Sequence, residues 1–184
     1  MNYGTSVNSK ITTKDLSKPT PCNEWNIKDL AAHVLYELSW VPDIISGKTI
    51  SEVGDKHDGN LMGDDFVAAW QKTAKKIEKT VKVCDLKATA HLSYMDTTND
   101  YFLREQASDF LIHGWDMAAA LGVNPKFDSV VAQEVYNDAK PKLDKWGGGE
   151  MFAVQIKVPV SADIQTKLLA LFGRDINWRP KFST

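Results

Sequence analysis

The chain has 184 residues and a formal net charge of -2, with 43% hydrophobic and 25% charged residues. This length suits one domain with a buried core, so we expect residues 1–184 to form a single domain that needs no disulfides for stability. The near-neutral charge gives no electrostatic reason to expect nucleic acid as a partner.

Cysteine content and hydropathy predict a cytoplasmic protein. Cys22 and Cys84 form no CxxC pair and are too few for a disulfide framework, which fits a reducing compartment. Residues 1–19 contain no apolar run of the kind found in signal peptides, and no later segment approaches the ~18 apolar residues of a membrane span. We therefore expect no membrane partner. The protein is expected to be a monomer or a homodimer.

The first helix signal follows the stretch PTPCNEWN, residues 19–26. Asn26 can cap a helix that starts at Ile27, and Asp29 at its third position completes a capping-box-like pair. Apolar residues then recur at steps of three and four until Pro42, which is expected to kink or end the helix. They are Ile27, Leu30, Ala31, Val34, Leu35, Leu38 and Val41. His33 borders this apolar stripe.

Two more helices are predicted after a long connection. Residues 47–63 carry glycine, aspartate and lysine without periodicity and are expected to form a crossover loop. A helix resumes at Asp64, with one apolar and one lysine-rich face, and is followed by a further loop. Thr98 or Asn99 can cap the next helix, which we expect to stop at Gly122.

Towards the C-terminus the sequence predicts a helix over residues 129–145, an extended segment and a final helix. Pro141 weakens or bends the first of these helices, and the glycines at 147–149 end it. The stretch AVQIKVPV alternates and could form an edge strand or an extended arm, and Gly173 is the expected stop of the last helix. Long amphipathic helices, one lengthy crossover and little strand signal together predict an all-α bundle.

The chemistry is expected in the stretch DFLIHGWDMA, residues 109–118. Asp109 and His113 are four residues apart, so on a helix they can direct a carboxylate oxygen and an imidazole nitrogen to one point. Their neighbours are mostly apolar, and unpaired charge is costly in such surroundings. A divalent cation bound by Asp109, His113 and a ligand from a facing helix would compensate it, and His33 is the natural third ligand.

Spacing alone leaves two alternatives open. Asp109 and His113 could form a plain charge-assisted pair without a metal. Asp116 lies three residues after His113 and could be the ligand in place of Asp109. The spacing does not choose between these two acids.

The remaining reactive side chains are interpreted as structural or exposed. We expect His57 to be a solvated loop residue, Glu37 to be exposed, and His91 to lie in a loop without a role in the site. Cys22 has no basic residue beside it in the sequence and is interpreted as a structural thiol, while Trp25 can staple the start of the helix. No phosphate-cradling glycine loop, HExxH or GxSxG motif is present, which excludes those enzyme classes.

Three stretches stand out as a set: PTPCNEWNIKDLAAHV (19–34), DFLIHGWDMAAALG (109–122) and KLLALFGRDINW (167–178). In this order and spacing they resemble the metal-binding helical domain of mycothiol-dependent maleylpyruvate isomerase and its single-domain relatives, within the DinB-like superfamily. The resemblance implies a four-helix bundle with a long crossover between its second and third helices and a divalent metal, typically zinc, at one end of the core. It also implies that the ligands are His33, Asp109 and His113, which selects Asp109 over Asp116.

The function that this resemblance implies is thiol chemistry at a metal. Three protein ligands leave one coordination position open, as in reactive zinc sites, and in the isomerase a thiol cofactor adds to a conjugated double bond. We expect a divalent metal, zinc before nickel, iron or manganese, that activates a low-molecular-weight thiol for transfer to, or isomerisation of, an electrophilic small molecule. Asp116 and Trp115 are expected to surround the ligands. The alternatives are a non-catalytic metal- or thiol-binding or stress-related module, and a metal-dependent hydrolase.

The chain also departs from the isomerase. The isomerase has an additional C-terminal domain, whereas this chain ends shortly after GRDINW, so maleylpyruvate isomerisation itself is not expected. The family usually has a full amphipathic helix before PTPC, and the short polar stretch here predicts a short or irregular first helix. One acid and two histidines also match the facial triad of non-haem iron, so the preference for zinc rests on resemblance.

Overall fold

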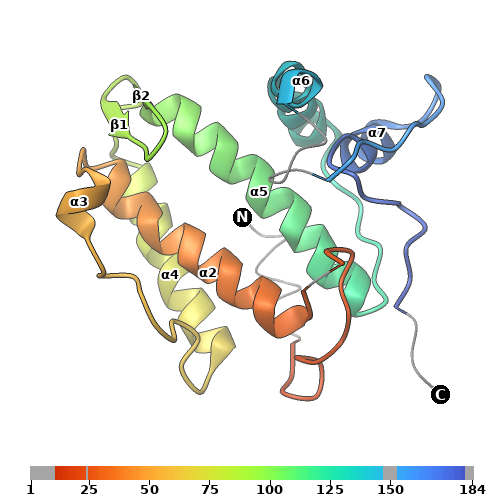
Figure 1. Ribbon diagram of the computed structural model, residues 1–184, viewed down its shortest axis with the longest axis horizontal. Coiled ribbons are helices and arrows are strands. Elements are labelled where there is room, and N and C mark those ends of the chain that lie inside the picture. The colour runs from red at the N-terminus through yellow and green to blue at the C-terminus, as the bar shows by residue number, and fades with distance from the viewer. Residues whose placement is uncertain (1–10, 24, 147–152, 181–184) are drawn as a thin grey trace.

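The structure, a computed structural model, describes residues 11–23, 25–146 and 153–180, and its elements carry the labels of Figure 1. Within these ranges it contains helices and two short strands, in the following order. They are α2 (Ile27–Ile44), α3 (Ile50–Val53), α4 (Phe66–Val81), β1 (Thr89–His91), β2 (Asp96–Thr98), α5 (Asn99–Ala120), α6 (Ser129–Trp146) and α7 (Ile164–Leu171). The fold is mostly helical, as predicted. None of the helices in these ranges has the length and apolar character needed to cross a membrane.

Helix α2 begins where the sequence predicts. Asn26 Oδ1 accepts a hydrogen bond from the backbone N–H of Asp29 at 3.0 Å, and the Asp29 carboxylate accepts one from the backbone N–H of Asn26 at 3.3 Å. This capping box satisfies N–H groups that have no partner within the first turn. Pro42 lies inside the helix, which continues past it to Ile44.

Helix α5 lies between two groups of helices, with α2 and α4 on one side and α6 and α7 on the other (Figure 1). Met117 and Ala118 pack into the cluster formed by the buried stripe of α2 and Trp70 of α4. Ile112 and Trp115 pack into a second cluster with apolar residues of α6 and α7. Because α5 packs against helices on both sides, its position relative to α2 is fixed, and so is the place where its polar side chains face α2.

Two segments predicted as loops contain short regular elements. Residues 47–63 include α3, where Thr49 and Glu52 form a second capping box. The segment after α4 contains an antiparallel hairpin in which Thr89 pairs with Thr98. Strands of three residues are too short for an alternating pattern to be recognised, and so the sequence did not predict them.

The C-terminal part is extended and then helical. Residues 153–159 form no strand, and the backbone N–H of Ile156 donates to the carbonyl of Ala170 in α7 at 2.9 Å. Gly173 ends α7 with a φ of +72°, and a Cβ at this position would lie 2.6 Å from the Cβ of Ala153. Glycine is therefore required both by the left-handed turn and by the close passage of the extended segment. A short or irregular first helix is expected in the stretch before PTPC; its residues 11–18 form turns and no helix, and its residues 1–10 lie outside the described residues, as do the glycines at 147–149.

Candidate metal centre

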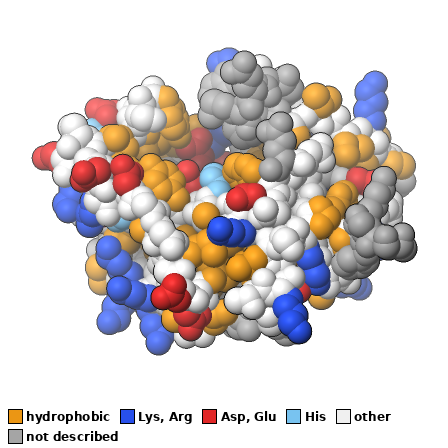
Figure 2. All heavy atoms as spheres, turned by 60° about the horizontal axis from the view of Figure 1, so that its bottom comes forward, with side chains coloured by type: hydrophobic (Ala, Val, Ile, Leu, Met, Phe, Trp, Pro, Cys, Tyr) orange, Lys and Arg blue, Asp and Glu red, His pale blue; other side chains and the backbone are white. Residues whose placement is uncertain are grey.

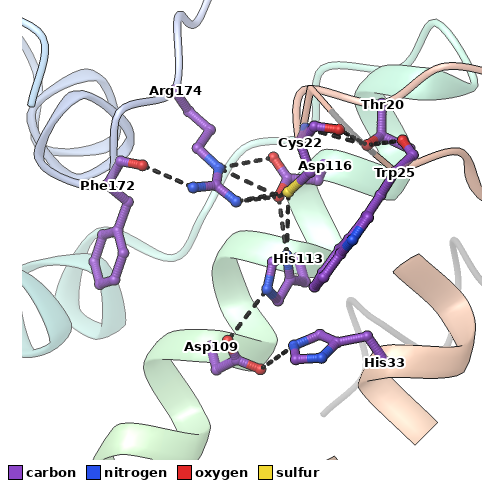
Figure 3. A network of polar contacts seen from close by, with 9 residues as sticks. All are labelled: Thr20, Cys22, Trp25, His33, Asp109, His113, Asp116, Phe172 and Arg174. Carbon is purple, nitrogen blue, oxygen red and sulfur yellow. Dashed lines mark hydrogen bonds and ion pairs between the residues drawn. The ribbon is translucent and has the colours of Figure 1, made fainter. Parts of the chain in front are cut away.

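Helices α2 and α5 bring His33, Asp109 and His113 together (Figure 3). Nε2 of His33 lies 3.9 Å from Oδ2 of Asp109, and Nε2 of His113 lies 3.2 Å from Oδ1 of the same carboxylate. The two imidazole rings are T-shaped, with centroids 5.1 Å apart. The three predicted ligands thus converge, although they come from distant segments of the chain.

The geometry of these side chains fits a small divalent cation. One ligand atom from each residue lies within 4.8 Å of the others. In tetrahedral zinc sites with bonds of about 2.0–2.1 Å the ligand atoms are about 3.3 Å apart, which is close to the separation of His113 and Asp109. The side chains of His33 and Asp109 are 27% and 36% exposed, so small molecules can reach the group. Figure 2 shows histidine and acidic side chains together near the centre of one face, beside hydrophobic ones.

A compact loop before α2 brings Trp25 over the imidazoles. The Thr20 hydroxyl donates to the carbonyl of Trp25 at 2.8 Å and accepts from the backbone N–H of Cys22 at 3.1 Å. The Trp25 ring centroid lies 4.6 Å from that of His33 and 6.0 Å from that of His113. An indole in this position covers part of both rings with apolar surface and restricts their rotation.

The second nitrogen of His113 faces Asp116. Nδ1 of His113 lies 3.0 Å from Oδ2 of Asp116, whose side chain is fully buried. Arg174, from the segment after α7, donates from Nη2 to the same oxygen at 2.9 Å (Figure 3). When Nδ1 carries a proton and donates it to Asp116, the lone pair of Nε2 is free to coordinate. A carboxylate placed in this way commonly orients histidine ligands in metal sites.

Without a bound metal, the surrounding side chains shift the pKa values of the two imidazoles in opposite directions. Burial alone would lower the pKa of His113, but hydrogen bonds with Asp109 and Asp116 raise it to about 11. Burial lowers the pKa of His33, against the opposing effect of the Asp109 charge. Burial would raise the pKa of Asp116, but its hydrogen bond with His113 and the charge of Arg174 lower it. A positive charge is therefore favoured between the two carboxylates.

A second group of potential ligands, Cys22, His113 and Asp116, shares His113 with the first. The Cys22 sulfur lies 3.3 Å from Oδ2 of Asp116 and 3.9 Å from Nδ1 of His113. However, Nη2 of Arg174 lies 2.9 Å from the same sulfur. A cation bound there would be repelled by the adjacent guanidinium, so the group of His33, Asp109 and His113 is the better candidate.

One expectation about the surroundings of the ligands is wrong, and Cys22 has a neighbour that the sequence did not indicate. Trp115 donates to Asn124 at 3.0 Å and packs towards α6 and α7, so Trp25 is the tryptophan beside the imidazoles. Cys22 has no basic residue beside it in the sequence, but in space Nη2 of Arg174 lies 2.9 Å from its sulfur. Both Trp25 and Arg174 lie in stretches that carry the family resemblance, and that was the only signal for them in the sequence.

Three further titratable side chains, His57, Glu37 and His91, lie outside the proposed ligand group. His57 is buried and lies 2.9 Å from the buried Asp43, so its interpretation as a solvated loop residue is wrong. Glu37 is half-buried, not exposed. His91 pairs with Asp96 inside the hairpin at 2.8 Å and is not part of the ligand group.

Comparison with known proteins gives a match over residues 5–118 to the family described as mycothiol maleylpyruvate isomerase N-terminal domain. Two uncharacterized proteins of Mycobacterium tuberculosis, from strains CDC 1551 and H37Rv, are each 28% identical over 171 residues. These residues cover 91% of this chain and 90% of each relative. No solved structure gives a significant match.

Proposed function

The chain belongs to the family of mycothiol maleylpyruvate isomerase N-terminal domains, and on that premise we propose that it binds one divalent metal ion through His33, Asp109 and His113. The proposed metal is zinc, with nickel, iron and manganese as the other candidates. The proposed activity is the activation of a low-molecular-weight thiol, such as mycothiol, for addition to an electrophilic small molecule. In this proposal α2, α4 and α5 are three helices of a four-helix bundle, and the connection between α2 and α4 is its crossover.

The observation that carries the proposal is the convergence of two imidazoles and one carboxylate on the partly exposed side of α2 and α5. Three ligands of this kind leave a coordination position for an exchangeable molecule. Asp116 and Arg174 lie on the other side of His113, so a small molecule would approach a bound metal from the side of His33 and Asp109, whose side chains are partly exposed.

A divalent metal at this position would lower the pKa of a bound thiol and polarise a substrate carbonyl. The side chains around the ligands have separate roles in this proposal. Asp116 fixes the tautomer of His113 through Nδ1, and Arg174 keeps Asp116 ionised by balancing its charge. Trp25 covers the imidazoles and excludes water from one side of them.

Metal analysis of the purified protein tests the ligand assignment. We expect the wild type to hold one equivalent of zinc or cobalt after loading and dialysis, and His33→Ala and His113→Ala to lose it. His91→Ala is the matched control, because His91 pairs with Asp96 and lies outside the ligand group. Full metal content in either ligand variant would show that the assignment is wrong.

Cobalt substitution then tests the thiol step. A thiolate bound to cobalt gives a charge-transfer band in the near ultraviolet, which we expect on addition of mycothiol or glutathione to the cobalt-loaded protein. Turnover of an electrophile panel would support a thiol-dependent enzyme, whereas thiol binding without turnover would favour a binding module. Hydrolysis without any thiol requirement would favour a metal-dependent hydrolase.

A further inference from the structure

Helices α2 and α4 lie side by side (Figure 1), and a cavity of about 410 Å³ lies between them and the connection that joins them. This volume is within the range of small-molecule sites. None of the three proposed metal ligands lines the cavity. Helix α4 presents one face to it, since its lining residues recur at helical steps. They are Ala69, Lys72, Thr73 and Lys76.

His57 is a buried polar residue in the wall of this cavity. Its side chain is 7% exposed, and its Nε2 lies 2.9 Å from Oδ2 of Asp43, which does not line the cavity. Burial alone would raise the pKa of Asp43, but hydrogen bonds with Lys48, Lys56 and His57 hold it well below its usual range. Asp43 is therefore an ionised acceptor. In the neutral imidazole the proton is then on Nε2, and Nδ1 offers a lone pair.

The Nδ1 atom of His57 has no hydrogen-bond partner among the residues that the structure describes. Buried polar atoms in proteins are usually paired, with protein groups, water or a ligand. Because the ring lines the cavity, a hydroxyl or amine of a molecule in the cavity is suited to be this partner.

Lys72 and Lys76 bring two positive charges to the same cavity. They are four residues apart on α4, so their side chains leave the helix on one face, one turn apart. Neither lysine forms an ion pair or hydrogen bond with another of the described residues, whereas Lys48 and Lys56 are both paired with Asp43. Two neighbouring ammonium groups without a carboxylate partner attract an anion.

Two acids also line the cavity, but at the beginning of α4. Oδ1 of Asp65 accepts a hydrogen bond from the backbone N–H of Ala68 at 3.0 Å and so caps the helix, and Asp64 precedes it. Lys72 is seven residues after Asp65, which is about 10 Å along the helix axis. The negative and positive charges of the cavity are thus separated, and an anion is favoured at the lysine end.

The remaining lining is partly apolar. Leu38 of α2 and Met62 of the connection are each 8% exposed, and Leu61 beside Met62 is partly buried. Contact with an apolar molecule would remove further apolar surface from water and so favour binding. The cavity therefore combines an apolar wall, an unpaired imidazole nitrogen and two unpaired ammonium groups.

We propose that this cavity is a second small-molecule site, which binds a small carboxylate with a hydroxyl group on an apolar body. The carboxylate lies at Lys72 and Lys76, the hydroxyl donates to Nδ1 of His57, and the apolar body covers the apolar wall. This site is separate from the metal centre, and the inference does not rest on the proposed function.

Calorimetric titration of the full chain with 4-hydroxybenzoate tests the site. We expect one molecule to bind with a dissociation constant of about 0.1–1 mM, which is reasonable for a ligand of about ten non-hydrogen atoms. The affinity should be the same for metal-free and zinc-loaded protein. Benzoate lacks the hydroxyl and 4-hydroxybenzamide lacks the charge, and each should bind about three- to tenfold more weakly.

Variants of the lysines test where the carboxylate binds. The double variant with Lys72→Gln and Lys76→Gln should bind 4-hydroxybenzoate about tenfold more weakly and 4-hydroxybenzamide as the wild type does. The double variant with Lys75→Gln and Lys79→Gln is the matched control. It removes the same charge from the same helix, but neither lysine lines the cavity, and so its affinities should match those of the wild type.

His57→Phe tests the hydrogen bond to the hydroxyl. This variant should bind benzoate and 4-hydroxybenzoate equally, because it has no acceptor in the wall. If His57→Phe does not fold, the comparison of the two ligands on the wild type still decides the point, since equal affinities there would contradict a hydrogen bond to His57.

Three further results would overturn the proposal. Absence of saturable binding of 4-hydroxybenzoate by the metal-free protein would show that the cavity is not a site for such molecules. Binding that requires zinc would place the carboxylate at the metal centre instead. Equal weakening in the two double lysine variants would show that the net charge of α4, and not the pair at the cavity, attracts the anion.

Discussion

His113 and the fully buried Asp116 lie 3.0 Å apart through Nδ1 and Oδ2, and this contact leaves Nε2 of the same ring for Asp109. Spacing in the sequence left Asp109 and Asp116 as alternative partners of one imidazole. In the structure each acid has its own ring nitrogen. Asp109 is on the side of His33, and Asp116 is on the side of Arg174, where an adjacent guanidinium opposes a metal ion.

We expect Asp116→Asn to weaken zinc binding about 10- to 100-fold, because a neutral amide holds the Nδ1 proton of His113 less strongly than a carboxylate does. Competition with a chromophoric chelator measures the affinity. Asp100→Asn is the control, since Asp100 is a half-exposed acid at the start of the same helix, paired with Arg104. A zinc affinity within twofold of the wild type would contradict the orienting role of Asp116.

Zinc uptake should release about one proton per site near pH 7.5. The pKa of His113 is raised to about 11, so its ring is protonated at this pH and must lose a proton before Nε2 can coordinate. The pKa of His33 is lowered, so His33 is already neutral and contributes no proton. Between the lowered pKa of His33 and about pH 11, the affinity should fall about tenfold for each unit by which the pH falls. Calorimetric titrations in buffers of different ionisation enthalpy measure the proton, and uptake without proton release would argue against His113 as a ligand.

Asp43 should make the protein sensitive to acid. This buried carboxylate accepts hydrogen bonds from Lys48 at 2.8 Å and Lys56 at 2.5 Å and lies 2.9 Å from Nε2 of His57. Burial alone would raise the pKa of Asp43, but these three partners hold it well below its usual range. Because the folded-state pKa is depressed, its contribution to stability is complete above the unfolded-state pKa of about 3.9 and is lost as the pH falls towards the folded-state value.

Asp43→Asn is accordingly expected to lower the free energy of unfolding at pH 7 by about 1–3 kcal/mol, nearer the lower end because both lysines are half exposed. The difference from the wild type should shrink towards pH 2. Urea unfolding at several pH values, followed by circular dichroism, measures both effects. Asp58→Asn, at an exposed position of the same segment, should have little effect at any pH.

Trp70→Ala should destabilise the fold by about 3–5 kcal/mol, because it removes a fully buried indole that stacks on Phe110 at a centroid distance of 5.4 Å. Trp70→Phe keeps most of the contact and should cost less. Thermal unfolding ranks the two variants. Folded Trp70→Ala should still bind metal in the wild-type ratio, because the ring contacts of Trp70 are with Phe66 and Phe110 and not with the proposed ligands. Loss of metal from folded protein would show that α4 shapes the site.

The sequence predicted those features that depend on neighbouring residues. The start of α2 follows from Asn26 and Asp29, the end of α5 follows from Gly122, and the shared face of Asp109 and His113 follows from helical spacing. These signals involve residues within one or two helical turns of each other, and so they can be recognised in the sequence without knowledge of the tertiary structure. The hairpin and α3 carry the same kinds of signal, but over too few residues to be distinguished from a loop.

The rest of the site depends on contacts between distant segments. Cys22 and Arg174 are separated by 152 positions, and no local pattern indicates that they touch. The same is true of His57, which Asp43 draws into the interior from a glycine-rich connection. The apolar stripe of α2 already suggested His33 as the third ligand, but only the family resemblance chose Asp109 over Asp116, because helical spacing carries no information about the register of α2 against α5.

Arg174 ties the last part of the chain to the proposed ligands, since it donates both to Asp116 and to the Cys22 sulfur. Attachment of this terminal segment and orientation of the His113 ring are therefore linked equilibria, and whatever strengthens one must strengthen the other by the same free energy. Occupancy of the centre should slow amide exchange and protease cleavage around residues 172–178, a surface far along the chain from the histidines. Amide exchange at residues 172–178 would therefore indicate whether the proposed centre holds a metal ion.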